Sequence, residues 1–274
     1  MFGAYSKLNI ERSTFKARFW QWPNILAIDA VLIALLWHLV FAAALSQSTH
    51  FAPIAVLGLS IWLTYSADRL FDGAKLPVAQ LHSLRHQFAK HHTRILWRIW
   101  FGILAINIAI AFTGLTNHQL IRGAVLLALC LIYTLLNQKL SSRFFPKELC
   151  VAIIYASGVV VFLRPVAKLW IPAVFLMLLC LINCLIISFN ERKVDAAMDT
   201  QSIARSLPQL PFVLYACCTL ALITLEQQWL LPFGTSLTTL MLIHFFRKQL
   251  SIESFRVFAD TALLTGPILM LSFS

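Results

Sequence analysis

Acidic side chains recur at intervals of four residues in two stretches of this chain. The stretch "LTYSADRLFDG" contains Asp68 and Asp72, and the stretch "FNERKVDAAMD" contains Glu191, Asp195 and Asp199. Residues four apart lie on one face of a helix. Each stretch therefore predicts a row of carboxylates that repel one another unless something positive lies between them.

The convergence of four or five such acids predicts a divalent cation. Clustered carboxylates raise one another's pKa unless a cation or basic side chains offset their charge. Mg²⁺ prefers oxygen ligands, keeps several waters and typically binds one or two carboxylates together with substrate phosphates. The hypothesis is therefore a Mg²⁺ ion that carries the diphosphate head of a lipid, whose tail would lie between helices.

The composition places these acids in a membrane protein. The 274 residues are 59% hydrophobic and only 12% charged, whereas soluble domains are roughly half apolar and about a quarter charged. The net charge of +11 does not indicate nucleic acid binding, because the basic residues lie in short blocks between apolar runs rather than along one face.

The elements that must position the acids are nine apolar segments. We expect an all-α membrane protein, a bundle of nine transmembrane helices in a single domain spanning residues 1–274. Some segments are shorter than the roughly 20 residues of a straight span, so eight spans and a re-entrant piece are an alternative. The segments are residues 24–45, 52–66, 95–115, 120–136, 149–163, 171–189, 212–225, 229–246 and 255–273.

Basic residues predict the orientation of this bundle. With the N-terminus inside, all of the 22 Lys and Arg residues except Arg122, Arg164 and Lys168 fall on the inner side, as the positive-inside rule requires. We therefore expect a protein integral to the cell's inner membrane, with the C-terminus outside. Residues 1–23, which alternate aromatic and basic side chains, are expected to form an amphipathic leader on the cytoplasmic surface.

The orientation brings the two acidic stretches to the same side of the membrane. Asp68 and Asp72 follow the second apolar segment, and the stretch from Glu191 to Asp199 follows the sixth. Both therefore face the cytoplasm, four segments apart, which is consistent with a weak internal repeat. We interpret them as the two halves of one site.

On these residues the chain resembles the UbiA superfamily of intramembrane prenyltransferases, nine-helix bundles with two aspartate-rich motifs after the second and sixth helices. In the first motif Asp68 and Asp72 match, while Thr64 and Tyr65 replace a leading Asn-Asp. The second motif is either Asp195 with Asp199 or, as its flanking pattern favours, Glu191 with Asp195.

The resemblance implies transfer of a prenyl group from a polyprenyl diphosphate to a lipophilic or aromatic acceptor, with Mg²⁺ as cofactor and no nucleic acid partner. The expected metal ligands are Asp68, Asp72, Glu191, Asp195 and Asp199. The expected catalytic residues are Asp68, Asp72 and Asp195 with Arg69 and Lys147. The expected substrate contacts are Arg69, Lys147, Arg192, Lys193, Tyr65 and Asn190.

Other ionisable residues leave alternatives open. Asp29 and Asp260 lie just inside their apolar segments, where each must face the bundle interior, paired with a nearby Arg or exposed to a polar cavity. The loop "LHSLRHQFAKHH" is interpreted as a helical cap over the site rather than a metal pair of His82 and His86. The alternative functions are an ion-coupled or lipid transporter, a catalytically inactive UbiA-like protein, and a structural membrane partner.

Overall fold

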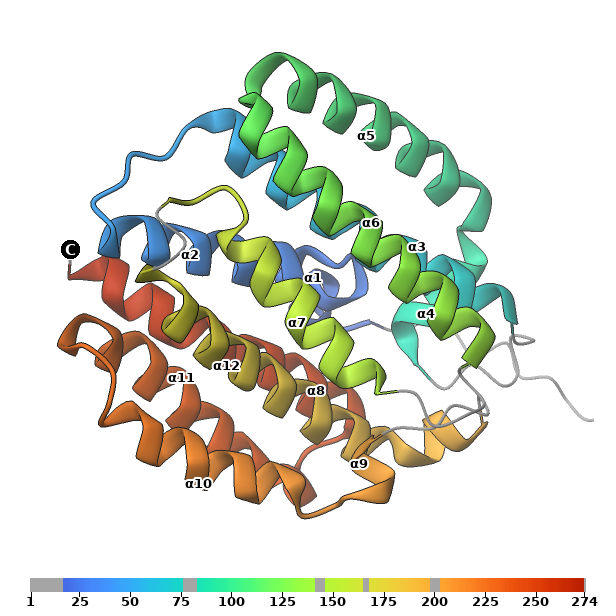
Figure 1. Ribbon diagram of the computed structural model, residues 1–274. Helices are drawn as coiled ribbons and strands as arrows, with labels where there is room; N and C mark the ends of the chain where they lie inside the picture. Colours follow the sequence, from blue (N-terminus) through green and yellow to red (C-terminus); the bar gives the residue numbers. More distant parts are fainter. Residues whose placement is uncertain (1–16, 76–82, 141–145, 165–167, 198–202, 274) are drawn as a thin grey trace, which may run out of the picture.

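The computed structural model describes residues 17–75, 83–140, 146–164, 168–197 and 203–273, apart from the side chains at 75, 138–140, 192–197 and 204–205. Its described part is helical throughout (Figure 1). The elements in chain order are η1 (Phe19–Gln21), α1 (Trp22–Ile25), α2 (Ile28–Ala44), α3 (Phe51–Lys75), α4 (Leu84–His91), α5 (Thr93–Gly114), α6 (Asn117–Leu140), α7 (Lys147–Val160), α8 (Trp170–Ala197), α9 (Ile203–Ser206), α10 (Leu210–Leu222), α11 (Gln227–Phe245), η4 (Phe246–Gln249) and α12 (Ile252–Ser272).

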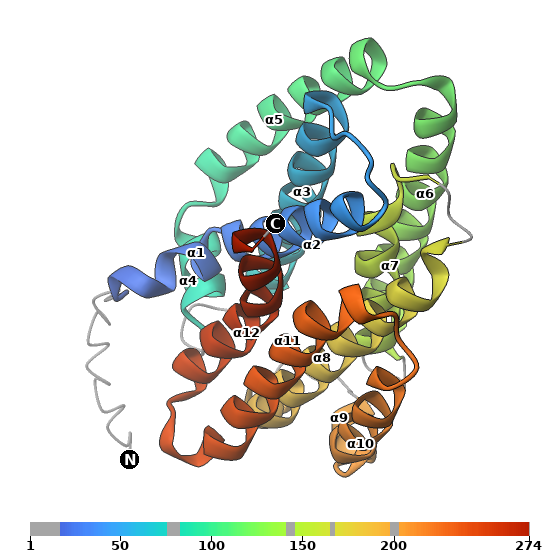
Figure 2. The same cartoon turned by 90° about the vertical axis from the view of Figure 1, so that its left-hand side faces the viewer.

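The long helices pack side by side around the middle of the molecule. Helices α11 and α12, α3 and α5, and α7 and α8 form the closest pairs, and α2 packs against α3 and α12 (Figure 2). In Figure 1 the ends of α3, α6 and α8 lie at one end of the bundle, and the C-terminus lies at the other. These three helices, which precede three of the predicted cytoplasmic loops, thus finish on one side.

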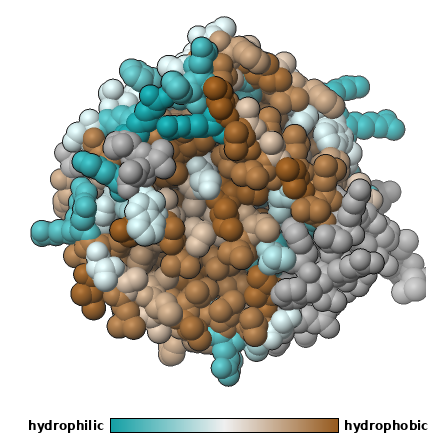
Figure 3. All heavy atoms as spheres, in the orientation of Figure 1, coloured by the Kyte–Doolittle hydropathy of each residue, from teal (hydrophilic) through white to brown (hydrophobic). Residues whose placement is uncertain are grey.

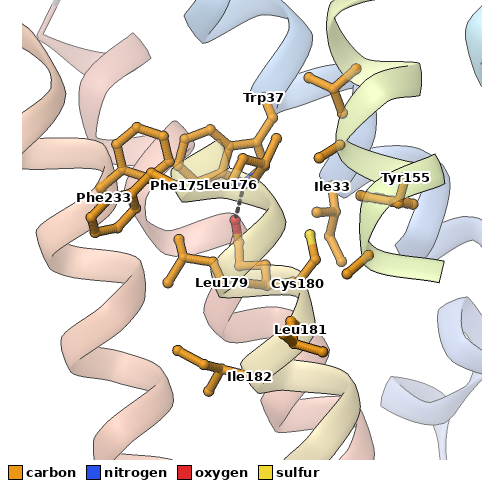
Figure 4. Close-up of a cluster of buried hydrophobic side chains, with 14 of the residues drawn as sticks. Ile33, Trp37, Tyr155, Phe175, Leu176, Leu179, Cys180, Leu181, Ile182 and Phe233 are labelled. Carbon is orange, nitrogen blue, oxygen red and sulfur yellow. Dashed lines mark hydrogen bonds between the residues drawn. The ribbon is translucent and has the colours of Figure 1, made fainter. Parts of the chain in front are cut away.

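A continuous core fills the bundle on the C-terminal side. Trp37 of α2 stacks on Phe233 of α11 with ring centroids 4.8 Å apart, and Phe175 of α8 packs on the same ring (Figure 4). The indole nitrogen of Trp37 donates a hydrogen bond of 2.9 Å to the backbone oxygen of Leu263 on α12. Since buried aromatic rings contribute both apolar area and ring contacts, this cluster fastens α2, α8, α11 and α12 to one another.

Six helices are long and apolar enough to cross a membrane, and a seventh span results if the bent pair of α1 and α2 counts as one. Each of the nine predicted segments contains a helix, but α7 and α10 have only 14 and 13 residues. The all-helical prediction is confirmed for the described residues, whereas the count of nine spans is not confirmed. Breaks and short helices, which apolar composition alone does not reveal, account for the difference.

The outer surface is apolar, as expected for contact with lipid. No residue of α5 is buried within the molecule, and the hydrophobic side chains of α6 are largely exposed. Hydrophobic residues cover most of the face drawn in Figure 3, and hydrophilic side chains gather near its margins. A soluble protein rarely exposes a continuous apolar area of this kind, so the several long apolar helices are consistent with an integral membrane protein.

The first helix is broken where it enters the bundle. Helices α1 and α2 meet at an angle of 76°, and Ala27 between them has a φ of 60°, a conformation that residues other than Gly rarely adopt. Helix α3 supplies partners for the exposed carbonyls, since Trp62 donates to Leu26 and Arg69 donates to Ile25 at 3.0 and 2.8 Å. These bonds satisfy backbone groups that a break inside a membrane would otherwise leave bare.

Part of the predicted leader packs against the bundle. The ring of Trp20 stacks on Phe258 of α12 at 5.6 Å, Gln21 is buried, and Trp22 meets Phe88 of α4 edge-on. Residues 1–16 lie outside the described part, so the amphipathic surface segment stays a prediction there.

Candidate active site

A cavity of about 270 Å³ lies between α2, α3, α6, α7, α8 and α12, with α4 at its inner end. Several residues of the core also form its wall, among them Ile33, Tyr155 and Cys180, which Figure 4 shows facing one another. Asp68, which lines the cavity, is exposed. The cavity therefore has an exposed acidic end near the predicted cytoplasmic side and an inner end within the core, where apolar side chains form much of the wall.

Asp68 and Asp72 both line this cavity from the last two turns of α3. The sequence prediction that one helical face presents both carboxylates is consistent with this placement. Tyr65 also lines the cavity and meets Tyr155 edge-on at 6.3 Å. Thr64, in contrast, is exposed and donates its hydroxyl proton to the carbonyl of Ser60, so the described structure places only one of the two replaced motif positions at the cavity.

Helix α4 places Arg85 and His86 opposite these acids. The Nε2 atom of His86 lies 4.0 Å from Oδ2 of Asp72. Burial, together with Arg85 and Arg256, lowers the pKa of His86 well below its usual 6.5, so the ring is neutral at pH 7. Burial alone would lower the pKa of Arg85, but Glu191 and Asp68 raise it above its ordinary value. The positive charge near the first acidic pair thus comes, in part, from α4.

A buried ionic network fastens α4 to α8 and α12. Arg256, which is 1% exposed, donates from Nε to Glu191 at 2.5 Å and from Nη1 to Glu253 and to Ser83 at 3.0 and 3.2 Å. The other oxygen of Glu191 lies 3.9 Å from Arg85. Glu253 also accepts the backbone N–H of Leu84 at 3.1 Å. Helix α4 is therefore held as a cap by charge-assisted hydrogen bonds, which are stronger than hydrogen bonds between neutral groups.

Deeper in the cavity, carboxylates meet amides rather than arginines. The side-chain nitrogen of Asn24 donates to Asp29 at 2.6 Å and to Asp260 at 3.0 Å, and Asn183 donates to Asp260 at 2.8 Å. Of the two alternatives left open by the sequence, this arrangement favours a polar cavity for both acids. The break between α1 and α2 makes it possible, because it turns Asn24 and Asp29 toward the same space.

The inner wall is completed by α6 and α7. Lys147 and Glu148 begin α7 and line the cavity, as do Tyr133 and Asn137 of α6. Glu148 is buried, and one of its oxygens accepts the backbone N–H of Ile203 at 3.4 Å. Its other oxygen has no hydrogen-bond partner. Lys147 therefore lies on the cavity wall, and its role in catalysis and substrate binding stays a prediction.

Arg69 has a structural contact besides its place on the cavity wall. Its guanidinium is buried and donates to the carbonyl of Ile25 at the helix break. Arg69 therefore positions α1 against α3, and this bond occupies one of its donors. Its proposed contact with substrate stays a prediction.

Several predicted site residues fall elsewhere. Asn190 is not among the residues that line the cavity. The backbone of α8 extends through Ala197, but the side chains of Arg192, Lys193 and Asp195 lie outside the described part, as do residues Asp199 and His82. Among the described residues, no three His, Cys, Asp or Glu side chains come together in a group that could hold a metal ion.

Sequence reasoning missed several residues of the wall, four of which have contacts described above. Arg85 and Arg256 look like ordinary basic residues at the inner ends of segments, where topology alone explains them. Asn24 and Asn183 carry a weak signal, since an amide within or next to a strongly apolar helix needs an internal partner. The interval of four residues between Arg256 and Asp260 was one further sequence signal that could have indicated Arg256.

The fold and the cavity together define a class: an all-helical bundle of membrane type with a polar site at one end. Comparison with solved structures then gives a particular match, the apo structure of a UbiA homolog from Aeropyrum pernix K1, with a TM-score of 0.61 and 14% sequence identity. The match covers 89% of this chain and 97% of that one. No protein-family model matches the sequence, and the search of curated proteins finds no match. The chain therefore has the UbiA-like fold that its sequence predicts.

Proposed function

We propose that this protein is an intramembrane prenyltransferase that uses Mg²⁺ to transfer a prenyl group from a prenyl diphosphate to a lipophilic acceptor. The observation that carries the proposal is one cavity, in a UbiA-like fold, with carboxylates and guanidiniums near α4 and largely apolar side chains toward the core. A lipid diphosphate has the same division into charged head and apolar tail.

The donor set fits Mg²⁺ at the first acidic pair. Asp68 and Asp72 offer carboxylate oxygens one turn apart on the cavity wall, and Mg²⁺ typically takes one or two carboxylates besides phosphate and water. Asp195 is the proposed ligand from the second stretch. Glu191 fits less well, because Arg256 and Arg85 hold its carboxylate. When bound, the ion would neutralise charge that develops on the departing diphosphate.

The basic residues of the wall would hold the diphosphate oxygens. The Nε atom of Arg85 is buried and has no hydrogen-bond partner, and such an unsatisfied donor costs free energy that an anionic oxygen would recover. Lys147 lies on the same cavity wall. Donors fixed in advance around a leaving group are usually the largest contribution to this kind of catalysis.

The cap and the apolar end would divide the remaining tasks. Helix α4, fastened through Arg256 and Glu253, would exclude water from the reacting carbon, where water would capture an allylic cation. The cavity volume of about 270 Å³ is just below the roughly 300 Å³ at which pockets begin to hold a whole small ligand. A long prenyl tail would therefore extend out between helices into the bilayer.

The test is release of diphosphate by the purified protein. With Mg²⁺, a panel of prenyl diphosphates and a panel of lipophilic acceptors, we expect turnover that falls by about 100-fold or more in Asp68→Asn, where shape is kept and charge is lost. Glu226→Gln, a carboxylate-to-amide change in the short connection before α11, is the matched control. Absence of diphosphate release from the wild type with every donor would reject the proposal in favour of a catalytically inactive bundle.

A transporter is the second candidate function. The observation that favours a transporter is the break between α1 and α2 with acids beside it. Discontinuous helices near buried acids mark ion and substrate sites in transporters. The aromatic core around Trp37 and Phe233 closes the other end of the cavity, which a transport path would have to open. Uptake into proteoliposomes driven by a proton or Na⁺ gradient, abolished by Asp29→Asn, would select this candidate.

A further inference from the structure

Four polar side chains from four helices meet on the deep wall of the cavity. Asn24 of α1, Asp29 of α2, Asn183 of α8 and Asp260 of α12 all line it. Asn24, Asn183 and Asp29 are 3%, 6% and 9% exposed. We refer to these four residues as the deep polar cluster.

The deep polar cluster is separate from the ionic network under the cap. At a rise of 1.5 Å per residue, Asn183 lies roughly 12 Å along α8 from Glu191, and Asp260 lies roughly 6 Å along α12 from Arg256. Both displacements point from the predicted cytoplasmic end toward the core. A substrate whose diphosphate lies near Asp68 and Arg85 would therefore have its reacting end, or a second substrate, next to the cluster.

The hydrogen bonds of the cluster reveal what a ligand must supply. Asp260 accepts side-chain N–H groups of Asn24 and Asn183. Asp29 accepts a side-chain N–H of Asn24 and the backbone N–H of Ala30, the latter at 2.8 Å. The Oδ1 atom of Asn183 is buried and accepts no hydrogen bond. The amide N–H groups of the described cluster are thus directed at carboxylates, and an acceptor oxygen is left over.

An acceptor oxygen without a hydrogen-bond partner, beside two carboxylates, favours a ligand that donates a hydrogen bond. A hydroxyl or an amino group would satisfy Oδ1 of Asn183, whereas a phosphate, a carboxylate or a ketone would add one more acceptor next to negative charge. An unpaired buried polar atom costs free energy. A site built to bond an O–H or N–H therefore rejects an analogue that lacks it.

We propose that the deep polar cluster binds the protic nucleophile of the acceptor, a hydroxyl or an amino group, and that Asp260 receives its proton. This inference rests on the proposed prenyl transfer. The C–O bond of the prenyl diphosphate breaks with both electrons leaving on the diphosphate. A lone pair of the acceptor oxygen or nitrogen forms the new bond to that carbon, and the proton it loses passes to a carboxylate oxygen of Asp260.

Asp260 is assigned this task rather than Asp29 because of its surroundings. Asp29 is buried and accepts a bond from the backbone at its own helix start. Asp260 is only half-buried and is bonded to Asn183, the residue with the open oxygen. Asp29 and Asn24 are positioning residues, since they fix one oxygen of Asp260 through the shared amide.

Binding is tested first, without any prenyl donor. Thermal unfolding of the purified protein is measured with 4-hexylphenol, dodecanol or dodecylamine, and with the methyl ethers of the two alcohols. We expect at least one hydroxyl or amino compound to raise the Tm, as a ligand of the native state does, and its ether not to. Binding should weaken by about tenfold in Asn183→Leu and in Asp260→Asn, and should stay unchanged in Glu226→Gln.

Equal stabilisation by alcohol and ether, no stabilisation by any of the three compounds, or full binding by Asp260→Asn would overturn the inference. A shift produced by Mg²⁺ or Na⁺ alone and lost in Asp260→Asn would also overturn it, in favour of a cation site. Whether the variants still fold is checked by their unfolding transition and by their stabilisation with geranylgeranyl diphosphate and Mg²⁺.

Turnover then separates this inference from the proposed function. With geranylgeranyl diphosphate, Mg²⁺ and the compound that binds, we expect Asp260→Asn to lower formation of the prenylated product by about 100-fold, the usual contribution of a general base. Stabilisation by geranylgeranyl diphosphate and Mg²⁺ should persist, because the first acidic pair is intact. Loss of both would overturn the inference. If the wild type releases no diphosphate at all, the proposed function fails, and the binding experiment alone decides the inference.

Discussion

At the scale of single residues, the partners of two carboxylates on the cavity wall differ in kind. Glu191 meets the guanidiniums of Arg256 and Arg85, whereas Asp260 meets the amides of Asn24 and Asn183. An ion pair fixes both its members, because separating them leaves a buried charge without a partner. Amide partners hold a carboxylate in place without neutralising it. The first arrangement is suited to holding the cap and the second to exchanging a proton.

The ion pair leads to a prediction on stability. Arg256→Met should lower the free energy of unfolding by about 3 to 5 kcal/mol, because it leaves Glu191 buried with only the more distant Arg85. Glu191→Gln should cost less, since Arg256 keeps Glu253. Thermal unfolding in detergent checks both variants, and the double variant should lose less than the sum of the two. Strictly additive losses would contradict a direct coupling between them.

The same pair bears on which acids form the second motif. Because Arg256 already pairs with the carboxylate of Glu191, we expect Glu191→Gln to affect the free energy of unfolding more than the rate of turnover. Asp195→Asn should lower turnover by orders of magnitude, as loss of a metal ligand does. Steady-state rates of diphosphate release, measured on samples matched for folded fraction, test the contrast. A larger loss of rate in Glu191→Gln than in Asp195→Asn would restore Glu191 as a metal ligand.

At the scale of elements, the sequence predicts helices better than it predicts where they break. The run of residues 24–45 is predominantly apolar, with no Gly or Pro in it to indicate a bend. Tertiary bonds from Trp62 and Arg69 stabilise the left-handed Ala27. A break made by distant residues leaves no local signal, and for that reason the meeting of Asn24 with Asp29 could not be predicted.

The crossing of α11 and α12 provides a prediction at this scale. A Cβ atom added at Gly266 would lie 1.8 Å from the carbonyl oxygen of Pro232, whereas one added at Gly102 would meet nothing within 4 Å. Gly266→Ala must therefore push the helices apart and break the bond from its N–H to Ser236. We expect a loss of about 2 kcal/mol or more.

Gly102→Ala is the matched control, because it makes the same change on the lipid-facing side of α5. It should be neutral or stabilising by up to about 1 kcal/mol, since Ala is the better helix former. Thermal unfolding in detergent compares the two variants. Equal stability of Gly266→Ala and the wild type would mean that the two helices are not in close contact.

At the scale of the whole molecule, the number of apolar segments and the positions of the two acidic stretches carried the resemblance to the UbiA superfamily, and the UbiA-like fold is confirmed. The acids at Asp68 and Asp72 were visible because like charges beside an apolar run are expensive. The residues that complete the cavity, such as Arg85 and Asn183, depend on which helices pack together. That information arises only from the tertiary contacts.

The orientation of the bundle is a prediction about the whole chain. The three basic exceptions, Arg122, Arg164 and Lys168, lie at the end of the molecule near the C-terminus, away from the cap, in the predicted topology. In a variant whose six cysteines are replaced, single cysteines are introduced by Thr116→Cys, Glu226→Cys and His91→Cys. An impermeant thiol reagent added outside intact cells should label the first two.

Labelling at residue 91 should appear only after the membrane is permeabilised, because that position is the last residue of α4, on the side of the acidic stretches. The result also decides where a substrate head group can enter, since the polar end of the cavity lies beneath α4. The introduced cysteine at Thr116 is the internal control for reagent access, as it lies in the short turn between α5 and α6. Labelling of residues 91 and 226 from the same side would contradict the predicted topology and would place the charged end of the cavity outside the cytoplasm.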